Sequence, residues 1–205
     1  MSKKIIPGLV FGLAVLPLSA LSAFAQNQSR NKSDDPAPAT HATPDANKPG
    51  PEQAFLAKRA GEYTRTIRFV GQGGADANPF TGTAKISVAL GGRFVVEENN
   101  DVVFGRPVSG LRIYGFNNVT KQYEAVWMYT MSTAMIRMTG TSDDGGKTID
   151  LSGTSADLHS GAVPLHAVVR QVDDDEFVVT LMSKGTDGKE AAFQETTYTR
   201  RKSPN

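Results

Sequence analysis

Residues 83–90 read TAKISVAL, and this stretch decides the fold. Its apolar side chains recur at every second position (Ala84, Ile86, Val88 and Leu90), and Thr83, Lys85 and Ser87 lie between them. Successive side chains of a β-strand point to opposite faces, so this alternation is typical of a strand with one buried and one solvated face. Residues 83–90 are therefore predicted to form a half-buried strand.

The same period of two recurs along the chain after residue 60. Aspartate, asparagine and glycine separate the segments, as at residues 117–121, 143–146 and 173–175, which is typical of antiparallel strands joined by turns. The predicted strands are residues 63–70, 83–90, 93–98, 111–116, 123–131, 134–141, 148–154, 163–172, 176–183 and 190–199.

Short connections between these strands favour pairing of sequence neighbours in an up-and-down order. A meander of this length has two exposed edges unless it closes, so we predict an all-β, antiparallel, calycin-like barrel of about ten strands. The alternative is a sandwich. It needs longer crossovers, and the sequence offers such connections at residues 71–79 and 99–110.

Residues 1–25 have the three parts of a secretory signal. A positive start (Lys3, Lys4) precedes an apolar run, and the small-residue pattern AFA ends at Ala25. Cleavage there makes Gln26 the first mature residue and predicts a periplasmic or secreted protein without a transmembrane segment. The alternative, a membrane anchor, is disfavoured because prolines interrupt the run and it is shorter than the ~20 residues of a spanning helix.

The mature chain is predicted to have a linker followed by one domain. Residues 26–50 consist mainly of small and polar residues and proline, which cannot bury enough surface to offset their ordering entropy, so we predict disorder there. Residues 51–202 are predicted to form the barrel domain. It begins with a short helix over residues 51–60, which has Pro51 in its first turn and ends at Gly61.

Charge and cysteine content exclude several classes of protein. Without the two signal lysines the chain has 20 basic and 21 acidic residues, which argues against nucleic-acid binding and against a polybasic membrane-surface protein. The chain has no cysteine, so neither disulfides nor a cysteine nucleophile is available.

An ordered series of short motifs resembles a known family. The series includes Ala60-Gly61-Glu62-Tyr63, Gly91-Gly92-Arg93-Phe94, Gly115-Phe116-Asn117-Asn118, Trp127, Asp187-Gly188-Lys189 and Tyr198-Thr199-Arg200. Together they resemble the domain of unknown function 1579 (DUF1579), which is placed among calycin-like and lipocalin-like barrels. The resemblance implies a barrel and no particular activity. Where many relatives have an Asp after the Trp, this chain has Met128, so the resemblance implies no acidic residue at that position.

The turn from helix to first strand predicts a structural clasp. Gly61 allows the chain to turn there, and Tyr63 is placed to plug one end of the barrel. Arg200 or Arg201 on the last strand is expected to stack over the Tyr63 ring as a planar cation on a π face.

Several aromatic, apolar and cationic residues are predicted to face the barrel interior. Trp127 and Tyr129 share a strand face, and the tight turn at Ser132 places Ile136 and Met138 opposite that strand. Arg112 and Tyr114 also share a face and are placed to bind an anionic group. The predicted ligand-binding residues are Trp127, Tyr129, Tyr114, Arg112, Arg65, Ile136 and Met138.

Arg65 has two interpretations, because it shares a face with apolar residues and a buried charge needs a partner. One is an anchor for a ligand carboxylate. The other, which we favour, is an ion pair with Glu97, Glu98 or Glu195 near the mouth of the barrel.

No catalytic motif, cofactor loop or convincing metal site is present. Barrels of this class sometimes bind haem through histidine, but His159, His166 and Asp157 have a generic spacing, and a surface histidine is the simpler interpretation. We therefore expect no cofactor, no metal and no enzymatic activity. The leading hypothesis is an exported barrel that binds a small, mostly apolar or carboxylate-bearing ligand. The alternatives are a packed barrel that acts through its surface, as a partner-binding or envelope-associated protein without a ligand, and, less favoured, a barrel enzyme.

Overall fold

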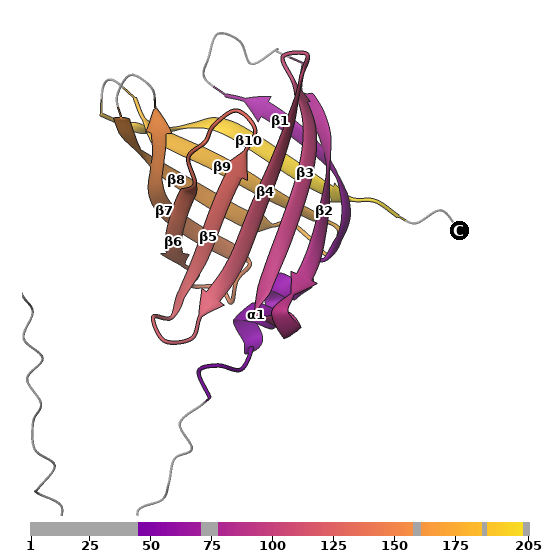
Figure 1. Cartoon of the computed structure of the whole chain (residues 1–205), viewed down its shortest axis with the longest axis vertical. Coiled ribbons are helices and arrows are strands. Elements are labelled where there is room, and N and C mark those ends of the chain that lie inside the picture. Colours follow the sequence, from indigo (N-terminus) through magenta and orange to yellow (C-terminus); the bar gives the residue numbers. More distant parts are fainter. Residues whose placement is uncertain (1–44, 71–77, 158–160, 186–187, 203–205) are drawn as a thin grey trace, which may run out of the picture. The chain divides into compact units, whose positions relative to one another are not determined.

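The computed structural model describes residues 45–70, 78–157, 161–185 and 188–202, and these residues form a closed antiparallel β-barrel with one short α-helix (Figure 1). The elements are α1 (Pro51–Ala57), β1 (Gly61–Phe69), β2 (Phe80–Ala89), a 3-10 turn η1 (Leu90–Gly92), β3 (Phe94–Val103), β4 (Arg106–Asn117), β5 (Gln122–Tyr129), β6 (Ile136–Thr141), β7 (Thr148–Asp157), β8 (Gly161–Gln171), β9 (Glu176–Lys184) and β10 (Glu190–Arg200).

Each strand pairs with its neighbours in the sequence, and β1 pairs with β10 to close the barrel. The predicted fold class, an up-and-down antiparallel barrel of about ten strands, is confirmed. Closure satisfies the backbone hydrogen bonds of both outer strands, which would otherwise form exposed edges. In the closing pair Tyr63 lies opposite Arg200, and Arg65 lies opposite Tyr198.

The strand alternation places one set of side chains inside the barrel. On β2, Ala84 and Ile86 are buried as predicted, whereas Val88 near the end of the strand and Leu90 in η1 are exposed. The inward side chains near α1 form a packed core. Its largest fully buried apolar members are Tyr63, Tyr198, Leu56, Met138, Ile149, Leu151, Val169 and Val179.

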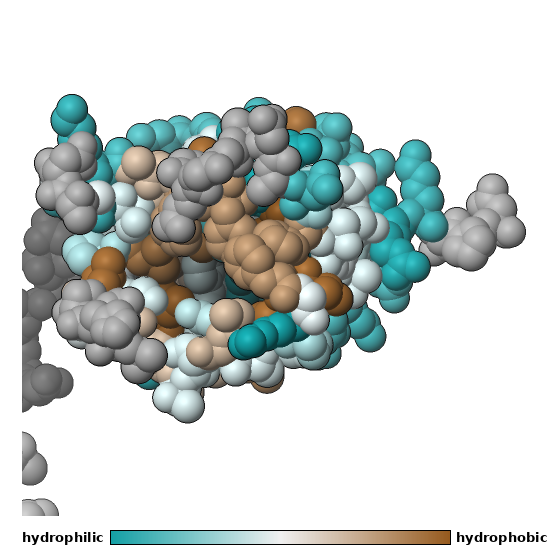
Figure 2. Space-filling view, turned by 90° about the horizontal axis from the view of Figure 1, so that it is seen from above, coloured by the Kyte–Doolittle hydropathy of each residue, from teal (hydrophilic) through white to brown (hydrophobic). Residues whose placement is uncertain are grey.

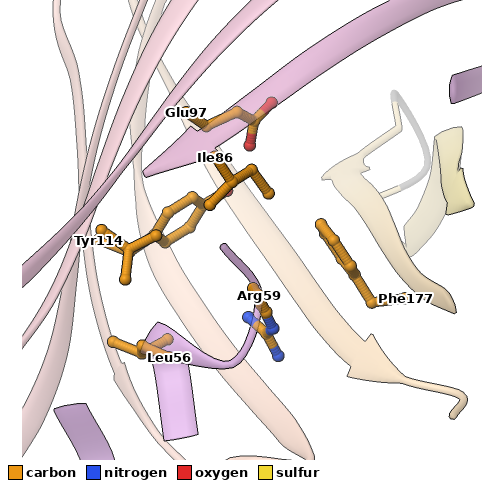
Figure 3. Close-up of a pocket in the computed structure, with 7 residues that line it drawn as sticks. Leu56, Arg59, Ile86, Glu97, Tyr114 and Phe177 are labelled. Carbon is orange, nitrogen blue, oxygen red and sulfur yellow. The ribbon is translucent and has the colours of Figure 1, made fainter. Parts of the chain in front are cut away.

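Helix α1 covers one end of the barrel, which we call the closed end (Figure 1). Gln53 holds it there, since its Nε2 donates to the Phe116 carbonyl at 2.8 Å and to Asn118 Oδ1 at 3.0 Å. Leu56 inserts into the core, and Arg59 lies over the Phe177 ring at 5.2 Å. The space left among these side chains is about 10 Å³, so the closed end is filled (Figure 3).

The predicted clasp is present, and Arg200 forms it. The Arg200 guanidinium lies 4.9 Å from the centre of the Tyr63 ring, and it donates to the Ala60 carbonyl at 2.6 Å and to the Lys58 carbonyl at 2.9 Å. The other candidate, Arg201, is exposed and pairs with Glu62 at 3.4 Å. Gly61 has a φ of +150°, which favours glycine at this turn.

One connection was predicted wrongly. Residues 99–110 do not form a long loop: they complete β3 and begin β4, which are joined by a tight turn at Phe104 and Gly105. The polar residues Asn99 and Asp101 of this segment point into the barrel and are buried.

The N-terminal predictions fall largely outside the described residues. The signal at residues 1–25 and most of the linker at residues 26–50 lie there. The last linker residues contact the domain, because Asn118 Nδ2 donates to the Ala46 and Lys48 carbonyls at 3.1 and 2.8 Å. No helix in the described part of the chain is long and apolar enough to span a membrane.

Candidate functional site

The half of the barrel opposite α1 contains a cavity of about 590 Å³. Figure 2 looks into this end of the barrel, where hydrophobic residues surround a hollow. The apolar walls come from strands all around the barrel: Ile67, Val108, Trp127, Ile136, Val163, Leu165, Leu181 and Phe193. Polar side chains also contribute, namely Arg65, Asn99, Asp101, Arg112, Ser155, Ser183 and Gln194.

Five of the seven predicted ligand-binding residues line this cavity: Trp127, Tyr129, Ile136, Arg65 and Arg112. Tyr114 and Met138 do not. Tyr114 lines the small space at the closed end, and Met138 is 1 % exposed within the core. Each lies two residues nearer the closed end than a cavity residue of its strand, and such a step moves a side chain about 7 Å. Shared strand face was predicted correctly for both, but depth was not.

The floor of the cavity is a layer of buried polar side chains, here called the polar layer: Arg65, Glu97, Asn99, Asp101, Arg112 and Tyr198. Glu97 also lines the small space at the closed end, whereas its partner Arg112 lines the cavity. The polar layer therefore separates the packed half of the barrel from the open half.

Arg65 and Asp101 form the first ion pair of the polar layer. They lie on β1 and β3, and Gly82 of β2 is the cross-strand neighbour of both. A Cβ atom at Gly82 would lie 1.9 Å from Asp101 Oδ1, so the missing side chain makes room for the pair. Asn99 Nδ2 donates to Asp101 Oδ2 at 2.9 Å, and the Arg65 guanidinium lies 5.0 Å from the centre of the Tyr198 ring.

Arg112 and Glu97 form the second pair, with Nη1 donating to Oε1 at 3.0 Å. Tyr198 joins them: its hydroxyl donates to Glu97 Oε1 at 2.8 Å and accepts a hydrogen bond from Arg112 Nη1. The Arg112 guanidinium also lies 4.9 Å from the Trp127 ring centre. These contacts hold the arginine in one orientation at the cavity floor.

Burial changes the proton affinity of several groups in this region. It raises the pKa of Tyr114 to about 12 and also raises the pKa of Tyr198, so both hydroxyls keep their protons at neutral pH. Burial also raises the pKa of Asp101, against the opposite effect of Arg65. For Arg112, burial lowers the pKa, but the neighbouring acidic groups, Glu97 first among them, together outweigh it, so the net shift is upward and the guanidinium stays charged.

Residues 48–200 match the family described as a protein of unknown function, DUF1579. The chain belongs to the DUF1579 family. The predicted resemblance is therefore confirmed. The family is described as one of unknown function, so membership assigns no activity to the chain. No curated protein matches the chain.

Solved structures resemble this DUF1579 chain in fold. The crystal structure of Rv2717c from M. tuberculosis is 18 % identical with a TM-score of 0.51, and the match covers 76 % of this chain and 100 % of that one. A redesigned β-barrel is 14 % identical with a TM-score of 0.38, over 74 % of this chain and 96 % of that one. At this identity the likeness to Rv2717c extends to the barrel fold alone.

Sequence reasoning missed Asn99 and Asp101 in this DUF1579 barrel. Both line the cavity, and Asp101 is the partner of Arg65 in place of the predicted Glu97, Glu98 or Glu195. A signal was present, because every second residue from Val95 to Val103 points inward and the series continues through these polar positions.

The mouth of the cavity carries an aromatic cluster. Phe104, in the turn between β3 and β4, is 73 % exposed and lies 5.7 Å from Phe69 and 4.7 Å from Phe80 between ring centres. Its φ of +50° is uncommon for a residue with a side chain, so the turn holds Phe104 in a strained conformation at the rim.

His166 lies on the outer face of β8. Its Nε2 is 2.9 Å from Asp150 and its Nδ1 is 3.0 Å from Glu190. His159 and the side chain of Asp157 lie outside the described residues. Within the described part, no group of three or more histidine and acidic side chains is arranged to hold a metal ion.

Proposed function

We propose that this protein is exported and binds a small, mostly apolar molecule in the barrel cavity. The cavity carries the proposal. Its volume of about 590 Å³ falls in the range of about 300–1,000 Å³ that is usual for small-molecule sites, and its walls are mainly apolar. No covalent step is part of the proposal.

The uneven filling of the barrel supports ligand binding over the packed-barrel alternative. The closed end leaves about 10 Å³, whereas the other half encloses a space large enough for a ligand. A barrel that served as a surface alone would have no reason to keep large side chains out of one half. The strands that enclose the cavity are paired all around, so the site is formed before a ligand arrives.

The proposed export rests on the sequence of residues 1–25. A positive start, an apolar run and an AFA cleavage pattern direct a chain to the secretory route. We propose that the ligand is met outside the cytoplasm, in the periplasm or the medium.

Binding is tested with N-phenyl-1-naphthylamine, an uncharged apolar dye, added to the mature protein. Trp127 is the single tryptophan of the chain and lines the cavity, so its emission reports on the site. We expect saturable quenching of Trp127 and a matching rise of dye emission, with one dye bound per chain. An unchanged Trp127 emission across the dye titration would contradict the proposal.

A matched pair of variants tests whether the dye binds inside the cavity. Ser155 and Thr154 are neighbours on β7: Ser155 lines the cavity, and Thr154 is exposed. Ser155→Phe should fill part of the cavity and weaken dye binding about tenfold or more, whereas Thr154→Phe should leave it within about twofold. Equal effects of the two substitutions would place the dye on the outer surface and favour the surface-acting alternative.

A further inference from the structure

The charges inside the barrel do not cancel among the described residues. Arg65 is paired with Asp101, and Arg112 with Glu97. A third arginine, Arg59, is 5 % exposed at the closed end. Its Nε donates to the neutral side chain of Gln171 at 3.0 Å. Three arginines and two carboxylates leave one positive charge in the interior.

Arg59 supplies the excess charge, and Arg112 is the most exposed of the three arginines and lines the cavity. Its side chain is 13 % exposed, against 2 % for Arg65 and 1 % for Glu97. Both of its hydrogen bonds to described residues use Nη1. Trp127 covers the face of the guanidinium at 4.9 Å, and neither Nε nor Nη2 donates a hydrogen bond to a described residue.

We propose that the natural ligand is a monoanion, an apolar chain that ends in a carboxylate, with its carboxylate bound by Arg112. This inference rests on the proposed function and adds the charge of the ligand. A carboxylate has two oxygens that match two parallel N–H groups of a guanidinium. One negative charge also brings the interior to neutrality, which offsets the cost of burying the anion.

A neutral or doubly charged head group fits the interior less well. An alcohol or ester leaves the positive charge of the interior uncompensated. A dianion replaces it with a net negative charge beside Glu97 and Asp101. The Arg65 side chain is only 2 % exposed, against 13 % for Arg112, so Arg65 is not the anchor of the ligand.

The test compares decanoate with decan-1-ol, which share a ten-carbon chain and differ in head-group charge. Affinities are measured at pH 8 by calorimetry and by Trp127 emission on the mature protein. We expect decanoate to bind at least about tenfold more tightly than decan-1-ol. Decan-1-ol binding as tightly as decanoate would overturn the inference and leave the proposed function standing.

Three substitutions change the interior charge in known directions. Glu97→Gln makes the net charge of the interior more positive. It should therefore raise the ratio of the affinity for decanoate to the affinity for decan-1-ol. Arg112→Gln should bring the affinity ratio of the two ligands close to about one. Arg59→Gln removes a charge that does not line the cavity, and it should lower the same ratio several-fold, about three- to tenfold.

The matched control is Arg137→Gln, which removes an exposed arginine from the outer face of β6. It changes the net charge of the protein as Arg59→Gln does, so its affinity ratio should stay within about twofold of the wild type. A ratio that does not respond to Arg112→Gln or Glu97→Gln overturns the inference. Dye binding without decanoate binding also overturns it, while failure of the dye, decanoate and decan-1-ol together refutes the proposed function itself.

Discussion

Arg65 on β1 and Asp101 on β3 form an ion pair across Gly82 of the strand between them. The two residues are two strands apart, and a side chain on the middle strand would separate them. Glycine is thus needed here because it has no side chain on the inner face of the barrel, and not for its backbone flexibility. The pair stands at the cavity floor, so its geometry matters for both stability and binding.

Gly82→Ala should disrupt this ion pair, because the added Cβ would lie 1.9 Å from Asp101 Oδ1. Separation of a buried pair leaves its charges uncompensated, and we expect a loss of about 3 kcal/mol in the free energy of unfolding, measured by urea denaturation. Thr83→Ala, on the exposed face of the same strand, is the control and should change it by less than about 0.5 kcal/mol. A loss below about 1 kcal/mol for Gly82→Ala would mean that the pair moves aside freely.

Tyr63 should be a main contributor to the stability of the closed end. Its ring packs against Phe177 and Arg200, and its hydroxyl donates to the Arg59 carbonyl at 2.9 Å. Tyr63→Ala should cost about 3–5 kcal/mol of unfolding free energy, by the usual cost of removing a core aromatic. Tyr63→Phe keeps the ring and should cost about 1 kcal/mol. Equal costs for the two variants would assign the effect to the hydroxyl rather than to packing.

His166 should give the protein a small pH-dependent stability. Partial burial lowers its pKa, but hydrogen bonds to Glu190 and Asp150 outweigh burial and raise the pKa above the ordinary 6.5. The contribution of protonated His166 to the free energy of unfolding is therefore complete below about pH 6.5. It is lost as the pH rises through the folded-state pKa. Both acids are well exposed, so it should be under about 1 kcal/mol. NMR titration of His166, assigned with His166→Asn, measures the pKa; a value below 6.5 would contradict the shift.

The mature protein should begin at Gln26. We expect N-terminal sequencing of protein recovered from outside the cytoplasm of a bacterial host to return Gln26, because AFA ends at Ala25. Ala25→Asp should block this cleavage, and Ala20→Asp, outside the AFA pattern, is the control. Exported protein that retains Met1 would show that residues 1–25 are not removed.

The strand pattern was readable from the sequence because alternation is a local property. The spacing of apolar residues within residues 83–90 was enough to predict strand β2. The short turn at Ser132 correctly predicted that Ile136 lies opposite Trp127. Closure could also be inferred, since a long meander leaves edges that need partners. Local pattern and topology together were sufficient for the fold.

The candidate site was less readable because its properties depend on depth and on partners distant in sequence. Arg112 and Tyr114 share a face, but one lines the cavity and the other the closed end, and the alternation carries no information on that difference. Asp101 lies 36 residues from Arg65, so no local spacing links them. Asn99 and Asp101 were not expected inside the barrel, because polar residues in a strand normally face solvent.

The pairing of β1 with β10 has a consequence for how the protein is made. Residues 63–69 leave the ribosome, and any translocation channel, long before residues 194–200, which are their partners. Until that last segment emerges, the growing chain can form only an open sheet. The two edge strands of such a sheet have unpaired backbone groups, and the barrel is not closed. The barrel can therefore close only when β10 is available, and a chain that ends before residue 194 would lack the partner of β1.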